Sequence, residues 1–143
     1  MEKIIKKYED LLRIHKALGI SIKRYSTAMS KSMDEETQDE RRDSLIKRFE
    51  LTYDLLWKYL REYIIAIQGT TFDSPRQVFK QCLTANLATP EETQQLVDLI
   101  ESRNLTTHVY DIDLASIVAL KISNYYNLIH AIVLRVKPSN IQK

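Results

Sequence analysis

One short stretch of the chain combines side chains suited to phosphate chemistry, and it runs Arg103-Asn104-Leu105-Thr106-Thr107-His108-Val109-Tyr110. Arginine carries a permanent planar cation whose paired N–H groups match phosphate oxygens. Histidine, with an unperturbed pKa of about 6.5, gives and takes protons near neutrality. Together, Arg103 and His108 can bind or attack a phosphodiester without a metal ion.

The same stretch can also be an ordinary polar connection between two helices. In that interpretation Arg103 complements the carbonyl end of its helix, and His108 is satisfied by local hydrogen bonds. If the segment stayed helical, the five steps from Arg103 to His108 would place the two side chains roughly 140° apart around the axis. A shared site therefore requires the helix to break near Asn104 or Leu105.

Composition places the chain among compact helical proteins. Its 143 residues suffice for one domain with one core, so we expect a single domain over residues 1–143. Only 2 residues are Gly and 3 are Pro, which favours long helices with few β turns. The net charge of +2, from 21 basic and 19 acidic side chains, excludes a uniformly basic nucleic-acid-binding surface but allows a local basic site.

Cysteine usage and hydropathy indicate the compartment. Cys82 is the one cysteine and cannot form an internal disulfide, which fits the reducing cytoplasm, where we expect the protein to reside. No run approaches the roughly 18 consecutive apolar residues of a membrane span, and the N-terminus lacks the apolar segment of a signal peptide. We therefore expect no membrane partner.

Apolar residues recur every three or four positions along most of the chain, the period of helices packed in a bundle. We expect a first helix over about residues 4–29, with His15 on its apolar seam as a satisfied core residue. An acidic connection over residues 30–43 is expected to run into a second helix over about residues 40–68. Gly69 ends that helix in a left-handed cap.

Three start signals predict the remaining helices. Ser74-Pro75-Arg76-Gln77 and Thr89-Pro90-Glu91-Glu92 each combine a capping side chain, a proline at the first helical position and a reciprocal capping residue. The last helix is expected to begin near Asp111 or Asp113 and to end at about Val136. We expect an all-α fold, an antiparallel up-and-down four-helix bundle with an extra short helix.

The second helix carries two apolar seams, of which one is interrupted by Glu50. The seams consist of Leu45, Phe49, Thr52, Leu56, Tyr59, Tyr63 and Ala66, and of Ile46, Tyr53, Trp57, Leu60, Ile64 and Ile67. A helix that is apolar around most of its circumference is either central in the bundle or packs one seam against a second subunit. Because so large an exposed patch would be unusual on a monomer, we favour a homodimer.

The sequence offers no other chemistry of comparable strength. Two glycines cannot build a glycine-rich phosphate loop, and three histidines and one cysteine are too scattered for a zinc site. Glu50 and Asp54 lie one turn apart on the second helix and could bind a cation, but the Glu-x-x-His pairs of carboxylate bundles are absent. We expect neither a metal ion nor a cofactor.

Residues 41–58, RRDSLIKRFELTYDLLWK, carry a further signal together with Ser74-Pro75-Arg76 and the Arg-x4-His-x-Tyr motif that begins at Arg103. In order and spacing, these segments resemble the nucleotidyltransferase substrate-binding proteins of the HEPN superfamily. The resemblance covers about residues 5–136. It implies a four-helix up-and-down core, a homodimer and a separately encoded minimal nucleotidyltransferase partner, the pair acting as a toxin–antitoxin system.

The resemblance also implies roles for individual residues. The protein would be a metal-independent endoribonuclease in which Arg103 holds the scissile phosphate and His108 is the general base or acid. The RNA 2′-hydroxyl would attack and leave a cyclic phosphate. Asn104 would orient His108 or the substrate, and Tyr110 matches the tyrosine that the nucleotidyltransferase modifies with adenylate to silence the toxin.

Two other functions stay open at this point. The family has also been interpreted as a non-catalytic subunit that binds a nucleotide or other substrate for its transferase, and a purely structural interaction protein is the third alternative. An RNA-cleaving protein needs basic side chains around its cleft. Arg48 and Arg76 are the candidate RNA or nucleotide contacts, with Lys58 and Arg61 as further sources of positive charge.

Overall fold

The computed structural model describes residues 1–108 and 110–141, and these residues form helices and connections without a strand. The predicted all-α fold is confirmed. In chain order the elements are α1 (Glu2–Ser30), α2 (Glu35–Gln68), α3 (Pro75–Thr84), α4 (Pro90–Leu105), the 3-10 turn η1 (Thr106–His108), α5 (Ile112–Arg135) and the 3-10 turn η2 (Pro138–Asn140).

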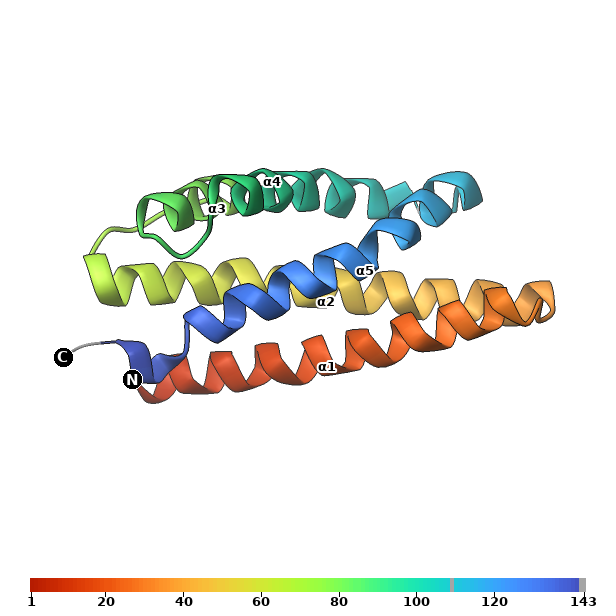
Figure 1. Ribbon diagram of the computed structural model, residues 1–143, viewed down its shortest axis with the longest axis horizontal. Coiled ribbons are helices and arrows are strands. Elements are labelled where there is room, and N and C mark those ends of the chain that lie inside the picture. The colour runs from red at the N-terminus through yellow and green to blue at the C-terminus, as the bar shows by residue number, and fades with distance from the viewer. Residues whose placement is uncertain (109, 142–143) are drawn as a thin grey trace.

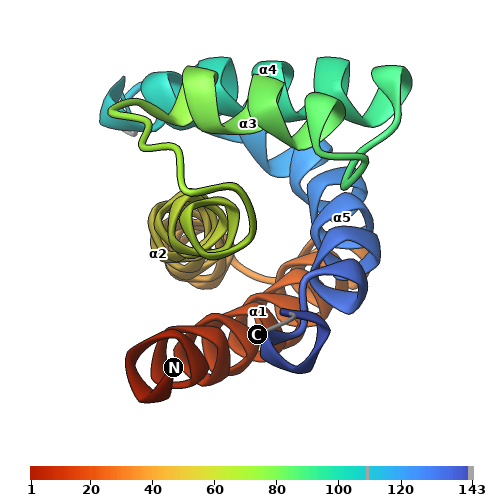
Figure 2. The ribbon, with the colours of Figure 1, turned by 90° about the vertical axis from the view of Figure 1, so that its left-hand side faces the viewer.

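The helices surround α2. In Figure 1, α1 and α2 run antiparallel along the length of the molecule, and α5 crosses them diagonally. Figure 2 shows α1 on one side of α2, the α3–α4 hairpin on the opposite side, and α5 closing the space between them. Because α2 packs against all four other α-helices, its side chains decide how the bundle is assembled.

Most of the acidic segment over residues 30–43 belongs to α2, so the predicted connection is shorter than expected. α2 begins at Glu35 because the Asp34 side chain accepts a hydrogen bond from the Thr37 amide at 3.0 Å and caps the helix. The acids that follow suit the positive end of the helix dipole. At its other end, Gly69 has φ 72° and forms the predicted left-handed cap.

The predicted starts of α3 and α4 are confirmed. Ser74 accepts from the Gln77 amide at 3.2 Å, with Pro75 at the first helical position. Thr89 and Glu92 form a complete capping box before α4.

Both apolar seams of α2 are buried within the single chain for most of their length. Leu56 and Tyr59 of the first seam and Leu60 and Ile64 of the second are fully buried. Only the last members of the seams, Ala66 and Ile67, are exposed. The seams therefore arise from the central position of α2, and they no longer argue for a second subunit.

α5 is long and apolar enough to cross a membrane by length and composition, contrary to the expectation that no segment would be. Its buried side chains, such as Val118, Ile122, Ile129 and Ile132, belong to the common core with those of α1, α2 and α4. Packing against three helices accounts for the buried apolar side chains of α5, because a helix buried on several sides is apolar around much of its circumference.

Polar contacts fix the end of α5. The Tyr8 and Tyr59 hydroxyls donate to the carbonyl oxygens of Val133 and Val136. Arg135 makes a two-pronged ion pair with Glu92, at 2.7 and 3.0 Å, and lowers the pKa of that carboxyl to about 2. The start of α4 and the end of α5 are thereby joined.

His15 is buried where α1 meets α5, and its ring stacks on Tyr126 with the ring centroids 4.1 Å apart. Its Nε2 lies 3.0 Å from the Tyr126 carbonyl oxygen, to which it can donate. Gly19 allows this packing, since a Cβ there would meet the Tyr126 ring at 3.0 Å. Burial lowers the pKa of His15 below 6.5, and nearby His130 lowers it further, against the opposing effect of the hydrogen bond. His15 is thus the satisfied core residue that its seam position predicts.

The stability of the fold should fall when the pH drops below about 6.5, because the unfolded chain then binds a proton at His15 that the folded chain excludes. His15→Phe keeps a ring for stacking and removes the titration. We expect its free energy of unfolding, measured in urea from pH 7.5 to 5, to decrease less steeply than that of the wild type. Parallel pH profiles for the two proteins would contradict this assignment.

Candidate functional site

The chain turns shortly after Arg103, at the end of α4. α4 ends at Leu105, η1 adds one 3-10 turn, and α5 begins at Ile112, where Asp111 accepts from the amides of Asp113 and Leu114 at 3.0 and 3.3 Å. The helix therefore breaks where a shared site of Arg103 and His108 requires it, and Asp111 is the cap.

The end of α4 is tied to α5 just before this break. The Tyr125 hydroxyl lies 2.6 Å from both the Ser102 hydroxyl and the Asp98 carboxylate. Burial raises the pKa of Tyr125 strongly, so the phenol keeps its proton and can donate. This buried network holds Ser102, and with it the backbone of Arg103, in one position relative to α5.

Arg103 points towards α2 and pairs with Glu50. Its Nη1 donates to Glu50 Oε2 at 2.9 Å and to the Thr106 hydroxyl at 3.0 Å. The Thr106 hydroxyl in turn lies 2.8 Å from Glu50 Oε2 and 2.6 Å from the Arg103 carbonyl oxygen, and it has one proton to share between them. Glu50 thus orients both the guanidinium and the first residue of η1.

A second carboxylate faces the same guanidinium less closely. Asp54 Oδ1 lies 3.8 Å from Arg103 Nε, which is too long for a hydrogen bond. Arg103 Nε is buried and has no partner in the described part of the chain. Glu50 and Asp54, whose spacing suggests a cation site, therefore flank the Arg103 cation instead.

Tyr53 of α2 is affected by Arg103 and also by Arg76, which lies at the start of α3. Burial raises the pKa of Tyr53, and nearby Asp54 raises it further, whereas Arg103 and Arg76 both act to lower it. The Arg103 guanidinium carbon is also 6.0 Å from the centre of the Tyr53 ring. Arg76 and Arg103 therefore both act on Tyr53, from α3 and from α4.

His108 and Tyr110 lie on the outer side of the turn. His108 Nδ1 is 3.0 Å from the Tyr110 hydroxyl, both side chains are exposed, and Tyr110 is 79% accessible to solvent. Asn104 is exposed as well, and its backbone carbonyl accepts from the Thr107 hydroxyl. An exposed histidine can exchange protons with a bound molecule.

The site therefore has an inner and an outer half. The inner half comprises Arg103, Glu50 and Thr106 against α2, and the outer half comprises His108 and Tyr110. Within residues 1–108 and 110–141, no hydrogen bond joins the two halves directly. They are connected through η1, whose first residue contacts Glu50 and whose last is His108.

Arg48, the other predicted RNA or nucleotide contact, serves the fold. Its Nη1 donates to the Ala17 carbonyl at 2.9 Å and to the Ser21 hydroxyl at 3.0 Å, both on α1. Arg48 therefore joins α2 to α1, whereas Glu50 joins α2 to α4. The structure does not bring Arg48 to Arg103.

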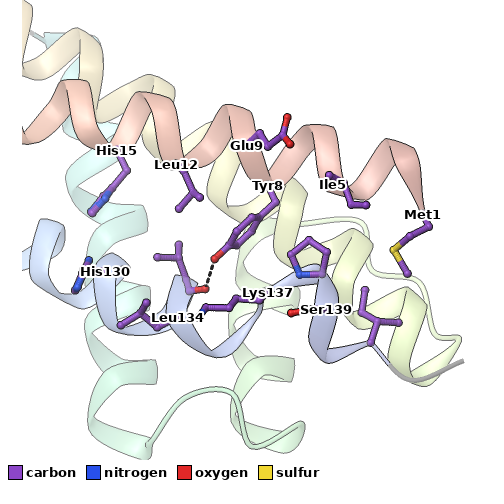
Figure 3. A pocket seen from close by; sticks show the side chains of 13 residues that line it. Met1, Ile5, Tyr8, Glu9, Leu12, His15, His130, Leu134, Lys137 and Ser139 are labelled. Atoms are coloured by element: carbon purple, nitrogen blue, oxygen red, sulfur yellow. Dashed lines mark hydrogen bonds between the residues drawn. The ribbon is translucent and has the colours of Figure 1, made fainter.

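A groove of about 800 Å³ lies away from this turn, between the start of α1 and the end of α5 (Figure 3). It is lined mainly by apolar side chains such as Ile5, Leu12 and Leu134, with His15 and His130 at one end. None of the predicted site residues lines it. Its size alone is therefore no reason to place the proposed chemistry there.

The described part of the chain has no group of three or more histidine, cysteine, aspartate or glutamate side chains arranged to hold a metal ion. Cys82 is buried among core residues, and burial raises its pKa to about 12, so the thiol stays protonated. Cys82 therefore fills space in the core.

Comparison with known proteins gives a family. Residues 13–137 match the family described as "Nucleotidyltransferase substrate binding protein like". The fold is also similar to a crystal structure of a protein from Thermus thermophilus, with a TM-score of 0.68 and 26% sequence identity, over 82% of this chain and 98% of that chain. No curated protein matches the chain.

Removing the Glu50 carboxylate should destabilise the fold, because it leaves a mostly buried arginine unpaired. The side chains of Glu50 and Arg103 are only 21% and 25% exposed. We expect Glu50→Ala to lower the free energy of unfolding by about 2 kcal/mol in urea titrations. Glu50→Gln, which keeps an acceptor for Arg103 Nη1, should recover part of the loss.

Asp54→Ala is the matched control, since Asp54 is 41% exposed and makes no hydrogen bond to Arg103. It should lower the free energy of unfolding by less than half as much as Glu50→Ala does. Equal losses for the two variants would show that Glu50 has no special part in holding Arg103.

Proposed function

The chain belongs to the family of nucleotidyltransferase substrate-binding-like proteins, and from this premise we propose that it works with a separately encoded minimal nucleotidyltransferase and cleaves RNA at the α4–α5 turn. The observation that carries the proposal is the break of α4 at Leu105, which leaves His108 exposed one 3-10 turn beyond the anchored Arg103. We also propose that the protein is a toxin of the HEPN superfamily.

Each half of the site has one task in the proposed reaction. Arg103 holds non-bridging oxygens of the scissile phosphate and stabilises the charge that builds on them. His108 accepts the proton of the RNA 2′-hydroxyl, which attacks the neighbouring phosphorus and forms a cyclic phosphate. The bond from phosphorus to the 5′-oxygen breaks, and that oxygen takes a proton from water and leaves as a hydroxyl. Asn104, exposed at the turn, orients the substrate.

Tyr110 can prepare His108 for this task. If His108 Nδ1 donates its proton to the Tyr110 oxygen, 3.0 Å away, then Nε2 is the unprotonated nitrogen and is available as a base. A bulky charged group added to the Tyr110 hydroxyl would disturb this bond and block access to the imidazole. The same exposed position thus suits both catalysis and its control by the transferase.

One observation favours a second function, that of a non-catalytic subunit that binds a nucleotide or another substrate for the transferase. The charge of Arg103 is already balanced by Glu50 at 2.9 Å and faced by Asp54 at 3.8 Å. An arginine so paired can be a structural element of the turn, and the exposed residues around it would then bind without reacting.

Association into a homodimer belongs to the same proposal. Its support is now the surface of α5, where Ile112, Ile117, Leu120 and Leu134 are each about half exposed or more. Large apolar side chains exposed along one helix favour a protein interface.

The proposed chemistry depends on His108. We expect His108→Ala to abolish RNA cleavage, because the base is lost, while the melting temperature stays nearly unchanged, since the side chain is exposed. Arg103→Lys should also fail, because an ammonium cannot make the two-pronged phosphate contact. Cleavage is measured on short RNAs, with mass spectrometry to identify the cyclic phosphate.

The metal-independent mechanism predicts undiminished cleavage in excess chelator. Full activity of His108→Ala, or strict dependence on magnesium, would rule it out. RNA binding without cleavage by the wild type would favour the substrate-binding subunit.

The proposed regulation depends on Tyr110, whose hydroxyl is accessible to another protein's active site. Incubation with the partner nucleotidyltransferase and ATP should add the mass of one or more adenylates and stop cleavage. Tyr110→Phe should gain no mass and keep cleaving in the presence of the partner. Tyr126→Phe, which removes the hydroxyl of a half-buried tyrosine on α5, is the control that should be modified normally. The same mass gain in Tyr110→Phe would show that another residue is the target.

A further inference from the structure

We propose that Asp54 is a competing carboxylate that occupies the place of the phosphate beside Arg103 and is displaced when a phosphate binds. This inference rests on the proposed function, because it assigns a regulator to the same phosphate site. Glu50 has a different part, since it stays bound and orients the guanidinium throughout.

The geometry of the guanidinium separates the two acids. An arginine presents its donors along edges, and a two-pronged contact to phosphate uses two N–H groups on one edge. Nη1 is committed to Glu50 and Thr106, at 2.9 and 3.0 Å. The edge formed by Nε and Nη2 is therefore the one left for a substrate, and Nη2 makes no hydrogen bond to the described part of the chain.

Asp54 lies beside the Nε–Nη2 edge but makes no hydrogen bond to it. Its Oδ1 is 3.8 Å from Nε, close enough for attraction between charges but too far for a hydrogen bond. Nε is buried and, among the described residues, unpaired. A phosphate that moved Asp54 aside would give Nε and Nη2 an acceptor each, so it would satisfy a donor that the free protein leaves unsatisfied.

Asp54 is also free to move. Its side chain is 41% exposed, against 21% for Glu50, and its only ion pair in the described residues is the long one to Arg103. A rotation towards solvent would restore the hydration of its carboxylate. Because α2 is held by its buried seams, this displacement needs no movement of the helix.

The consequence is a site that discriminates against anions with a single acceptor atom. A ligand must offer at least two oxygens to Nε and Nη2 to replace both the attraction of Asp54 and the water around it. A phosphodiester or a phosphate monoester meets this requirement, whereas a halide does not. Arg103 stays neutralised by the protein until such a ligand arrives.

Binding of inorganic phosphate to ¹⁵N-labelled protein tests the inference, with the Arg103 Nε–Hε resonance as the readout. Removing the competing charge in Asp54→Asn should tighten phosphate binding by about five-fold or more. Asp54→Ser should behave alike, because it also lacks the charge. Asp54→Glu should bind more weakly than the wild type, because its longer side chain can close the 3.8 Å gap to Nε.

Asp10→Asn is the matched control, since it removes the same charge from a carboxylate that pairs with Lys6 and Arg13 on α1. It should change the affinity by less than about two-fold, because exposed charges at a distance are screened by salt. The inference is overturned if Asp54→Asn binds no more tightly than Asp10→Asn, or if phosphate leaves the Arg103 resonance unmoved in every variant. If the Asp54 series behaves as expected and RNA is not cleaved, the inference stands and the nuclease function is wrong.

Discussion

The structure depends on the burial of α2 between the other helices. A helix packed on three sides must satisfy its polar side chains within the protein, because an unpaired buried charge is costly. Glu50 interrupts an apolar seam of α2 and meets this constraint by pairing with Arg103 and Thr106 from the end of α4. The position of the α4–α5 turn therefore follows from a requirement of the core.

The contact between Glu50 and the end of α4 explains why the inner half of the site is held in place while the outer half is exposed. Arg103 is held by Glu50 and by the buried Ser102–Tyr125 contact behind it, so its guanidinium needs little reorganisation when a ligand binds. His108 and Tyr110 lie beyond Thr106, the residue of η1 that contacts Glu50, and they are exposed to solvent. The proposed roles of His108 in proton transfer and of Tyr110 as a target for modification both need that exposure, whereas the proposed role of Arg103 needs a preorganised charge.

Local signals in the sequence predict most helix ends, although not the start of α2, and they do not predict the partners of Arg103. Gly69, Ser74, Thr89 and Asp111 mark helix ends through contacts that span a few residues, and these ends were predictable. The Arg103–Glu50 pair joins residues 53 positions apart, which no periodicity encodes. One signal was present, since Glu50 breaks an apolar seam and Asp54 follows one turn later. The two apolar seams of α2 suggest a dimer interface when only the sequence is known, but the single chain buries most of both seams. A sequence does not show which helix is central in the bundle.

The most direct test of the central claim is a crystal structure of the protein with a short RNA that carries a 2′-deoxy substitution at the cleavage position. The account predicts a phosphate within hydrogen-bonding distance of Arg103 Nε and Nη2, with the adjacent 2′-position facing His108 Nε2. RNA bound in the groove between α1 and α5, or bound with Arg103 still covered by Asp54, would contradict it.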